Sequence, residues 1–280
     1  MPKCVILDFD GTFTDVEQEG APFTAAFRAA VADLVGRDVE ADWARHAAEV
    51  DARPDVFGWE FDGKLVAPGN ADPYIRATTV AQRIFTQHGV LADPAVRATI
   101  VSALYHLAYA KSGTAFRPTA REVLATLAQS ERPVFVVTNA ATAVVNRKLR
   151  ELNPPGLEKL EVIGDARKYA VVPSARKDPR FDAVPTEQQL VGLARPVSPR
   201  RGHYFDALAA IAERTGVEFR DMIVCGDIYE LDLVLPLALG MQVHLVTGPQ
   251  TPAYERGALV ELEPRASMGT LDELLLRVEP

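Results

Sequence analysis

The stretch VILDFDGTFTD, residues 5–15, runs from an apolar segment straight into a group of acidic side chains. Asp8 ends the apolar run, and Asp10 follows after one intervening residue. Side chains two residues apart in a strand point to the same face, so these two carboxylates would repel each other. Such repulsion favours protonation unless a cation or a hydrogen-bond network separates the groups. An arrangement this unfavourable indicates a functional site at the end of a buried strand.

The composition is that of an ordinary globular protein, with 280 residues of which 48% are hydrophobic and 24% charged. A net charge of −8 argues against a general nucleic-acid-binding or anionic-membrane-binding surface. No apolar run is long enough to cross a bilayer, and no secretory signal is visible. Cys4 and Cys225 lie in apolar strand-like runs, as expected of buried reduced thiols. We therefore expect a cytoplasmic protein that binds neither nucleic acid nor membranes.

Short valine-rich runs separated by helical patterns indicate the fold. Apolar spacing typical of helices occurs between the runs, for example at Phe205, Leu208 and Ile211. Strands that alternate with helices predict an α/β protein with a Rossmann-like open parallel sheet, buried on both faces. The runs are CVIL (4–7), VFVV (134–137), MIVC (222–225), VHLV (243–246) and, more weakly, LEVIG (160–164).

Residues 16–112 break this alternation and are mostly helical by pattern. Helical segments are expected near 74–88 and 94–111, and the Asp-Gly turn within WEFDGKLV (59–66) predicts a hairpin. We interpret 16–112 as a separate, mostly helical domain inserted into an α/β core made of residues 1–15 and 113–280.

A long segment rich in proline and basic residues spans about 165–202. A loop of this length inside a compact domain is usually functional or mobile. Its charges have two interpretations that the sequence does not separate. They form either an ordinary solvated loop or a cationic rim near a site for an anionic substrate.

Polar side chains follow three of the predicted strands, at the point where each strand ends. In an open α/β sheet, ligands bind beyond these carboxyl ends, so the side chains should lie at one edge. Carboxylate oxygens in such a cluster suit Mg²⁺, and a carboxylate there can act as a nucleophile. The residues are Asp8, Asp10, Gly11 and Thr12, then Thr138 and Asn139, then Asp227 and Asp232.

The motifs DFDGT, VVTN and GDIYELD, in this order, resemble those of the haloacid dehalogenase-like superfamily. The resemblance implies that Asp8 is the nucleophile and Asp10 the general acid/base, whose backbone carbonyl also binds the metal. It makes Thr138, with Asn139, the phosphate-binding site. Asp227 becomes a metal ligand, with Asp232 as a direct or water-mediated helper.

The dehalogenases of the superfamily lack the second aspartate of the first motif, so Asp10 favours phosphoryl chemistry. The inserted helical region sits where this superfamily often carries a cap domain, which closes over the active site and selects the substrate.

The third motif of the superfamily is a cation, usually Lys, near the start of the helix that leads to the last motif strand. Counting back from GDIYELD places it beside Arg201, which is our first choice, with Arg200 second. Lys168, just after the weak strand, is a rival. An arginine could supply the charge because its guanidinium matches phosphoryl oxygens.

The sequence thus predicts a Mg²⁺-dependent phosphatase that acts on a small phosphorylated metabolite through an aspartyl-phosphate intermediate. A phosphomutase with the same intermediate is one alternative. A catalytically weak binding or regulatory protein on this fold is another. The C-terminal LDELLLRV (271–278) either packs on the sheet as a helix, which we favour, or joins a partner.

Overall fold

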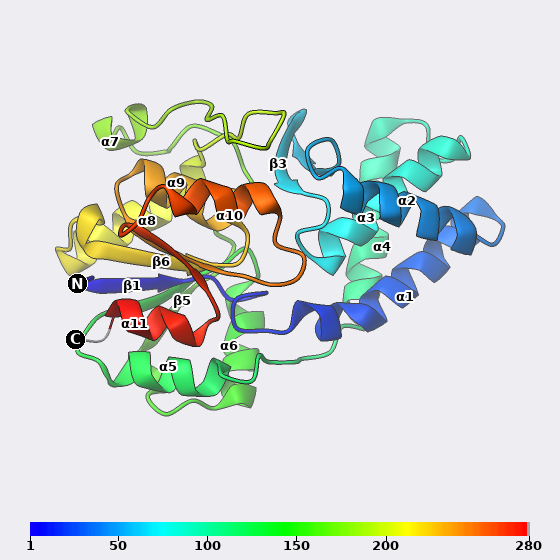
Figure 1. Ribbon diagram of the computed structural model, residues 1–280. Helices are drawn as coiled ribbons and strands as arrows, with labels where there is room; N and C mark the ends of the chain where they lie inside the picture. Colours follow the sequence, from blue (N-terminus) through cyan, green and yellow to red (C-terminus); the bar gives the residue numbers. More distant parts are fainter. Residues whose placement is uncertain (279–280) are drawn as a thin grey trace. The chain divides into compact units, whose positions relative to one another are not determined.

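A computed structural model describes residues 1–278 of the chain, whose main feature is a six-stranded sheet (Figure 1). The strand order is β5-β4-β1-β6-β7-β8, and every neighbouring pair is parallel. The predicted Rossmann-like α/β fold is therefore confirmed. The strands are β1 (Cys4–Leu7), β4 (Val134–Val137), β5 (Leu160–Ile163), β6 (Met222–Gly226), β7 (Gln242–Val246) and β8 (Ala266–Gly269).

Strand β1 lies at the centre of the sheet, where the direction of chain progression reverses. The chain continues from β1 to β4 and β5 on one side, then returns to pair β6 with the other side of β1. Ligands bind in such folds beyond the carboxyl ends of the strands at this switch point. Asp8 follows β1 directly and so stands at that position.

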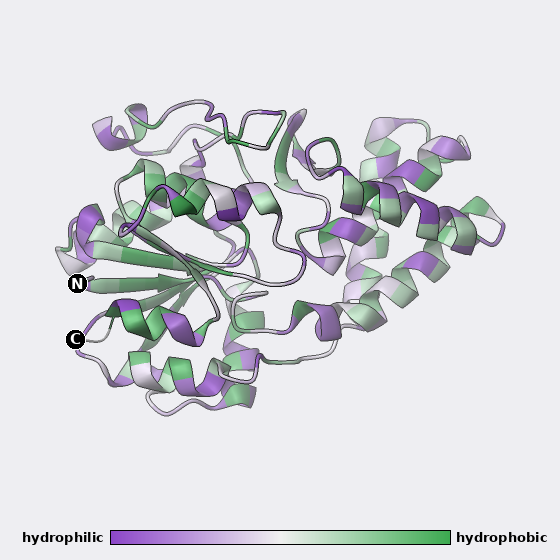
Figure 2. Cartoon of the chain, in the orientation of Figure 1, coloured by the Kyte–Doolittle hydropathy of each residue, from purple (hydrophilic) through white to green (hydrophobic). Residues whose placement is uncertain are grey.

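Helices cover both faces of the sheet because alternate strand residues point in opposite directions. Cys4 and Ile6 belong to the core cluster that contains α8 (Gly202–Thr215), α9 (Val234–Ala238) and α10 (Ala253–Val260). Val5 and Leu7 belong to the other cluster, with α5 (Ala120–Gln129), α6 (Thr142–Leu152) and α11 (Leu275–Val278). The strands between the two layers are strongly hydrophobic, as Figure 2 shows.

The C-terminal segment packs on the sheet, as the sequence predicts. Leu271, Leu274 and Val278 are buried in the second of these core clusters. The first part of the segment, Asp272–Leu274, is a 3₁₀ turn, and α11 follows it.

The chain divides into two compact units. The α/β unit contains Met1–Asp15, Phe61–Val66 and the chain from Phe116 onward, and the helical unit contains Val16–Glu60 and Ala67–Ala115. These limits differ from the predicted insertion, 16–112, chiefly at Phe61–Val66. This segment includes the turn between β2 (Gly58–Phe61) and β3 (Lys64–Pro68), which form the expected hairpin.

Backbone hydrogen bonds join the point where the chain leaves the α/β unit to the point where it returns. Thr14 and Phe116 form an isolated antiparallel bridge, and the backbone N–H of Arg117 donates to the carbonyl of Phe13 at 2.9 Å. The insertion therefore begins and ends at one place on the α/β unit.

The helical unit is built from α1 (Val16–Val35), α2 (Glu40–Ala52), α3 (Pro73–Gln87) and α4 (Pro94–Tyr109). Asp72 and Asp93 cap α3 and α4 by accepting backbone N–H groups of the first turn, and a proline follows each cap. The unit has its own core, in which aromatic side chains of α1 such as Phe23 and Phe27 pack against α3.

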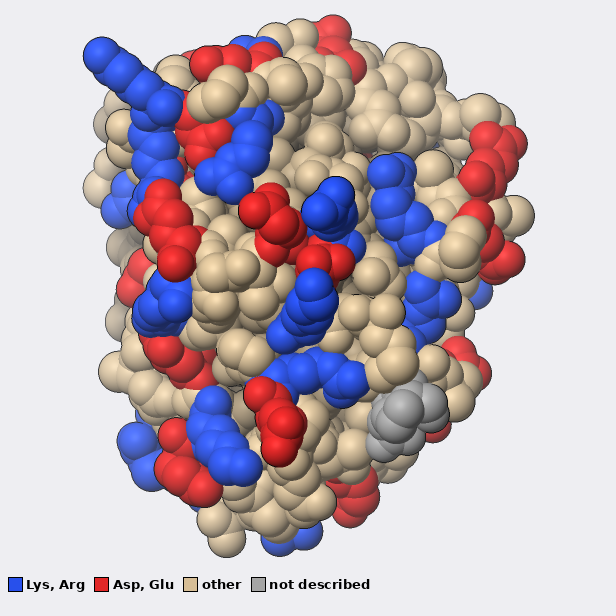
Figure 3. All heavy atoms as spheres, turned by 90° about the vertical axis from the view of Figure 1, so that its left-hand side faces the viewer, with Lys and Arg blue, Asp and Glu red and all other residues tan. Residues whose placement is uncertain are grey.

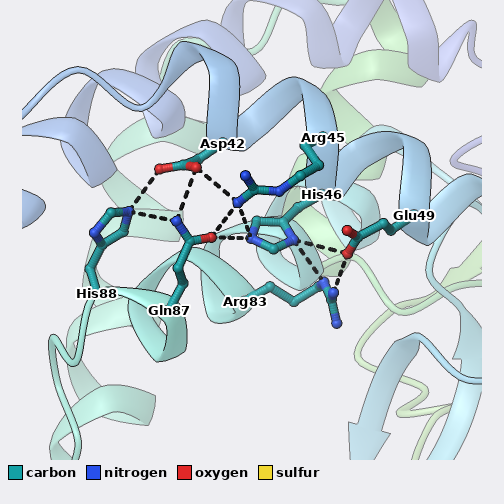
Figure 4. A network of polar contacts seen from close by, with 7 residues as sticks. All are labelled: Asp42, Arg45, His46, Glu49, Arg83, Gln87 and His88. Carbon is teal, nitrogen blue, oxygen red and sulfur yellow. Dashed lines mark hydrogen bonds and ion pairs between the residues drawn. The ribbon is translucent and has the colours of Figure 1, made fainter.

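A polar network joins α2 to α3 in the helical unit (Figure 4). The carboxylate of Asp42 accepts hydrogen bonds from the Gln87 side-chain amide at 3.0 Å and from His88 at 2.7 Å. Glu49 pairs with Arg83 and lies 3.1 Å from a ring nitrogen of His46. We refer to these residues as the α2–α3 network: Asp42, Arg45, His46, Glu49, Arg83, Gln87 and His88.

Acidic and basic side chains are interspersed on the face of the protein in view in Figure 3. Such mixing is typical of a solvated surface. Among residues 1–278, no helix has the length and hydrophobicity needed to span a bilayer.

Candidate active site

Three charged side chains meet in the α/β unit at the carboxyl ends of the central strands. The ammonium Nζ of Lys168 donates to Asp8 Oδ1 at 2.7 Å and to Asp232 Oδ1 at 2.8 Å. Asp8 follows β1, Lys168 follows β5, and Asp232 lies in the π-helical turn Tyr229–Leu233 after β6. The sheet topology therefore brings together residues that are far apart in the sequence, and all three are buried.

Asp227 completes a group of three carboxylates. Asp8, Asp227 and Asp232 each offer an oxygen, and these atoms lie within 4.8 Å of one another. The Thr12 hydroxyl lies 3.2 Å from Asp8 Oδ2 and 3.4 Å from Asp227 Oδ1. A Cβ atom on Gly11 would lie 2.0 Å from Asp227 Oδ2, so only glycine allows this loop to approach Asp227.

The cluster holds more negative than positive charge. Burial raises the pKa of the Asp8 carboxyl to about 7, against the opposing charge of Lys168, and the charges of Asp232 and Asp10 add to the rise. Burial would lower the pKa of Lys168, but Asp232 and Asp8 outweigh this and raise it above the ordinary value. Lys168 is therefore charged, while Asp8 lacks sufficient counter-charge.

The donor set fits a hard divalent cation. The three carboxylates supply oxygen ligands only, which Mg²⁺ prefers, and Lys168 alone leaves them with excess negative charge. A bound cation would stabilise the ionised form of Asp8. Asp8, Asp227 and Asp232 are the residues that would hold it.

Asp10 has a cationic partner that the sequence interpretation missed. Lys148 Nζ donates to Asp10 Oδ1 at 2.8 Å, and the Lys148 side chain is only 5% exposed. Lys148 lies on α6 between the buried residues Val145 and Leu149. A lysine on the apolar face of a helix is unusual, and this position was the signal available in the sequence.

Thr138 and Asn139 follow β4, as predicted, at the same edge of the sheet. Thr138 is buried, and its hydroxyl accepts the backbone N–H of Ala140 at 3.2 Å. The side-chain oxygen of Asn139 accepts the backbone N–H of Lys168 at 2.7 Å. Asn139 thus fixes the backbone from which Lys168 reaches Asp8.

The preference for Arg201, with Arg200 second, as the cation beside Asp8 is wrong, because Lys168 occupies this position. The guanidinium of Arg200 donates to the carbonyls of Val184 and Asp182. That of Arg201 donates to backbone carbonyls as well. The count from the final motif failed because the long loop separates Lys168 from the start of α8.

Several basic side chains of the long loop form ion pairs with acidic side chains of the same protein. Arg176 pairs with Glu213, Arg180 with Asp178, and Arg195 with Glu230. The loop also contains α7 (Pro179–Asp182) and an antiparallel bridge between Gln188 and Val197. These pairings favour the interpretation as an ordinary loop over a cationic rim.

Arg117 is a second residue that the sequence interpretation missed. Its Nε and Nη2 atoms donate to the carbonyl of Gly11 at 2.9 and 2.7 Å. The contact fixes the loop between Asp10 and Thr12. Arg117 lies just beyond the insertion, and no local sequence pattern links it to Gly11.

Comparisons with known proteins agree with this geometry. A model of the haloacid dehalogenase-like hydrolase family matches residues 2–234. A comparison of the sequence with curated proteins gave no significant match.

Solved structures share the fold at low sequence identity. YfnB of Bacillus subtilis, a proposed HAD-hydrolase bound to magnesium, is similar with a TM-score of 0.58 and 13% identity, over 100% of this chain and 99% of that one. A predicted phosphoglycolate phosphatase from Haemophilus somnus has a TM-score of 0.58 and 12% identity, over 99% and 98%. A protein proposed to be a β-phosphoglucomutase from Thermotoga maritima has a TM-score of 0.53 and 16% identity, over 99% and 98%.

The family match covers most of the chain, and the carboxylates and lysine meet at the switch point of a parallel sheet. The chain belongs to the haloacid dehalogenase-like hydrolase family.

Proposed function

We propose that this hydrolase is a Mg²⁺-dependent phosphatase that acts on a small phosphorylated metabolite through an aspartyl-phosphate on Asp8. The observation that carries the proposal is the contact of Lys168 with both Asp8 and Asp232 beside a third carboxylate, Asp227. A carboxylate nucleophile needs nearby positive charge when an anionic phosphoryl group approaches, and Lys168 supplies it.

The proposed reaction consists of two successive displacements at phosphorus. In the first, an oxygen of Asp8 attacks phosphorus, the bond to the leaving oxygen breaks, and Asp10 gives that oxygen a proton. In the second, Asp10 takes a proton from a water molecule, the water oxygen attacks phosphorus, and the bond to Asp8 breaks. Lys168 remains hydrogen-bonded at Asp8, and in this proposal the Thr138 hydroxyl binds a phosphoryl oxygen. Bound Mg²⁺ would neutralise charge on the carboxylates and on the phosphoryl group.

Two further parts of the proposal concern the rest of the molecule. The helical unit, inserted between residues 15 and 116, serves as the cap that selects the substrate. Cys4 and Cys225 are buried free thiols, which supports the reducing cytoplasm as the location of the enzyme.

The first test is phosphate release from a panel of small phosphomonoesters that includes an activated aryl phosphate, with Mg²⁺ or with EDTA. We expect Asp8→Asn to lose at least about 10³-fold in kcat, because the variant lacks the nucleophile. Asp221→Asn, which changes an exposed carboxylate paired with Lys3, is the matched control and should keep wild-type activity.

A labelled substrate tests the intermediate directly. The wild type should retain phosphate after an acid quench and release it to hydroxylamine, as an acyl phosphate does, and Asp8→Asn should not. An isomeric sugar phosphate in place of inorganic phosphate would identify a mutase. Folded wild-type protein that releases no more phosphate than Asp8→Asn would contradict the phosphatase.

A further inference from the structure

Arg201 is among the largest fully buried side chains in the described part of the protein. Its Nε donates to the carbonyl of Ser198 at 2.9 Å, and its Nη1 donates to that of Tyr169 at 2.9 Å. Its Nη2 donates to the carbonyls of Val66 at 3.1 Å and Glu230 at 3.2 Å. Burial lowers the pKa of Arg201 to about 10, so the group is still charged at neutral pH. A buried charge of this kind is expensive unless every donor is satisfied.

Two of these carbonyls belong to the segments that carry the active-site charges. Tyr169 directly follows Lys168, and Glu230 lies two residues before Asp232. One guanidinium therefore joins the backbone one residue after Lys168 to the backbone two residues before Asp232. The side chains of Lys168 and Asp232 form the 2.8 Å ion pair. A planar guanidinium with five N–H donors can reach four acceptors in fixed directions, whereas the ammonium of a lysine cannot.

The first turn of α8 makes a second contact with the same segments. The Tyr204 hydroxyl donates to the carbonyl of Asp232 at 3.0 Å, and the Tyr204 ring lies 5.3 Å from Lys168 Nζ. Gly202 donates its N–H to the carbonyl of Val172 at 3.0 Å, and a Cβ there would lie 2.2 Å from the Pro173 carbonyl oxygen. The start of α8 is thus held against the segment that follows Lys168.

The hairpin segment Phe61–Val66 completes the arrangement within the α/β unit. Its Val66 carbonyl is one of the four acceptors of Arg201, and the Phe61 ring lies 5.7 Å from the ring of Tyr169. The hairpin therefore contacts Tyr169, the residue next to Lys168, through the Phe61 ring. Its second link to Tyr169 runs through Arg201, which donates to both the Val66 and the Tyr169 carbonyls.

We propose that Arg201 and the Phe61–Val66 hairpin segment form a clamp that positions Lys168 against Asp8 and Asp232. Arg201 is then a positioning residue for the phosphoryl transfer proposed above, and the inference rests on that function. The cation near the start of α8 holds the backbone of the site, while Lys168 supplies the charge. A clamp of this kind acts on the transition state, because Lys168 must balance charge that moves onto Asp8 and the phosphoryl group.

The test compares Arg201→Lys with Arg200→Lys. Arg200 is the neighbouring residue, also donates to backbone carbonyls, and makes those contacts away from the site. Turnover is normalised to the folded fraction measured by circular dichroism. We expect Arg201→Lys to lose about tenfold or more in kcat, with KM within about twofold of the wild type. Arg200→Lys should stay within twofold in both. A folded Arg201→Lys with the kcat of Arg200→Lys would overturn the clamp.

A second pair of variants decides the question if Arg201→Lys does not fold. Phe61→Ala removes the ring against Tyr169, and Lys64→Ala changes an exposed residue of the same hairpin. We expect kcat to fall about threefold or more for Phe61→Ala, with KM unchanged, and to stay at the wild-type value for Lys64→Ala. Equal kcat values for the two variants would overturn the clamp. Wild-type protein measured alongside separates this result from failure of the phosphatase, since only that failure removes wild-type turnover.

Discussion

Two charged networks in this protein connect separate elements of structure, and they differ in how far their side chains are buried. In the active-site cluster, the side chains of Lys168, Asp8 and Asp232 are 1%, 9% and 4% exposed. In the α2–α3 network, the side chains of Arg83 and Glu49 are 27% and 40% exposed. The first network joins strand ends at the switch point of the sheet, and the second joins α2 to α3 (Figure 4).

The difference indicates what each network is for. Removing charges from water is costly, so a buried ion pair contributes little net stability and its loss leaves an uncompensated charge. A pair near solvent contributes modestly and is screened by salt. We infer that the active-site cluster is retained for chemistry, whereas the α2–α3 network supports the packing of α2 on α3.

The largest effect on stability and turnover is expected when Lys168, the cation of the buried network, is removed. Lys168→Met leaves Asp8 and Asp232 buried without their partner, and we expect a loss of about 3–5 kcal/mol in the free energy of unfolding. Phosphate release should fall by at least about 10³-fold, because the charge beside Asp8, the proposed nucleophile, is gone. Urea unfolding and the turnover assay measure these effects.

Lys177→Met is the matched control, because Lys177 is an exposed lysine in the same loop. Equal stability of the two variants would show that burying Asp8 and Asp232 without their cationic partner costs nothing, which would contradict the expected difference between the two networks.

Glu255 is a third buried acidic group to compare with these two networks, and within the described residues the structure records no ion pair for it. Its Oε2 accepts the backbone N–H of Tyr229 at 3.3 Å, and within residues 1–278 its Oε1 has no hydrogen-bond partner. Burial, followed by the charge of Glu230, raises the pKa of Glu255 well above its ordinary value. Glu230 itself accepts two hydrogen bonds from Arg195, at 2.9 and 2.7 Å.

The raised pKa of Glu255 fixes the sign of its contribution to stability. The folded state holds a proton that the unfolded chain releases above about pH 4.5, so stability is present below that pH and is lost as pH rises. Glu255→Gln keeps the acceptor and stays neutral. We expect it to be more stable than the wild type by about 1–2 kcal/mol at pH 8 and equal near pH 4.5.

Thermal unfolding at both pH values measures this difference. Glu261→Gln, at an exposed position, should show no such pH dependence. A Glu255→Gln protein that loses stability at pH 8 as the wild type does would contradict the expectation.

The smallest effect is expected in the α2–α3 network, with the opposite dependence on pH. Hydrogen bonds from Gln87 and then His88 lower the pKa of Asp42 to about 2. A lowered pKa gives stability that is present above the unfolded value of 3.8 and is lost as pH falls towards 2. Asp42→Asn should therefore have a lower thermal unfolding midpoint than the wild type at pH 6. At pH 2 the two midpoints should be equal.

Asp33→Asn, in the same unit and exposed, is the comparison for Asp42→Asn. High salt should reduce the Asp42 effect and leave the Lys168 effect largely intact, because screening acts mainly on charges near solvent. Equal salt sensitivity of the two effects would remove the distinction between the networks.

The fold could be predicted because its signals are local. Apolar runs matched β1, β4, β5, β6 and β7, and the Asp-Gly turn matched the hairpin. Strand β8, with the sequence ASMG, was not predicted because it is short and has no β-branched or aromatic residue.

The candidate site could be predicted only as far as strand ends specify it. Asp8, Asp227 and Asp232 follow strands, so topology alone placed them together. Lys168 was ranked below Arg201 because the spacing argument does not account for a long loop between the lysine and α8. The apolar helix face around Lys148 marks this lysine as unusual but does not name its partner. The contacts of Lys148 and Arg117 depend on tertiary packing, and no sequence spacing encodes them.

The bridge between Thr14 and Phe116 has a consequence for protein engineering. Because both ends of the insertion meet at one point, the segment between them can be exchanged as a module without lengthening the path from Asp8 to α5. Arg201 limits this freedom, since the Val66 carbonyl is one of its acceptors. A transplanted module must therefore bring its own backbone acceptor to that guanidinium, or the recipient must replace the arginine.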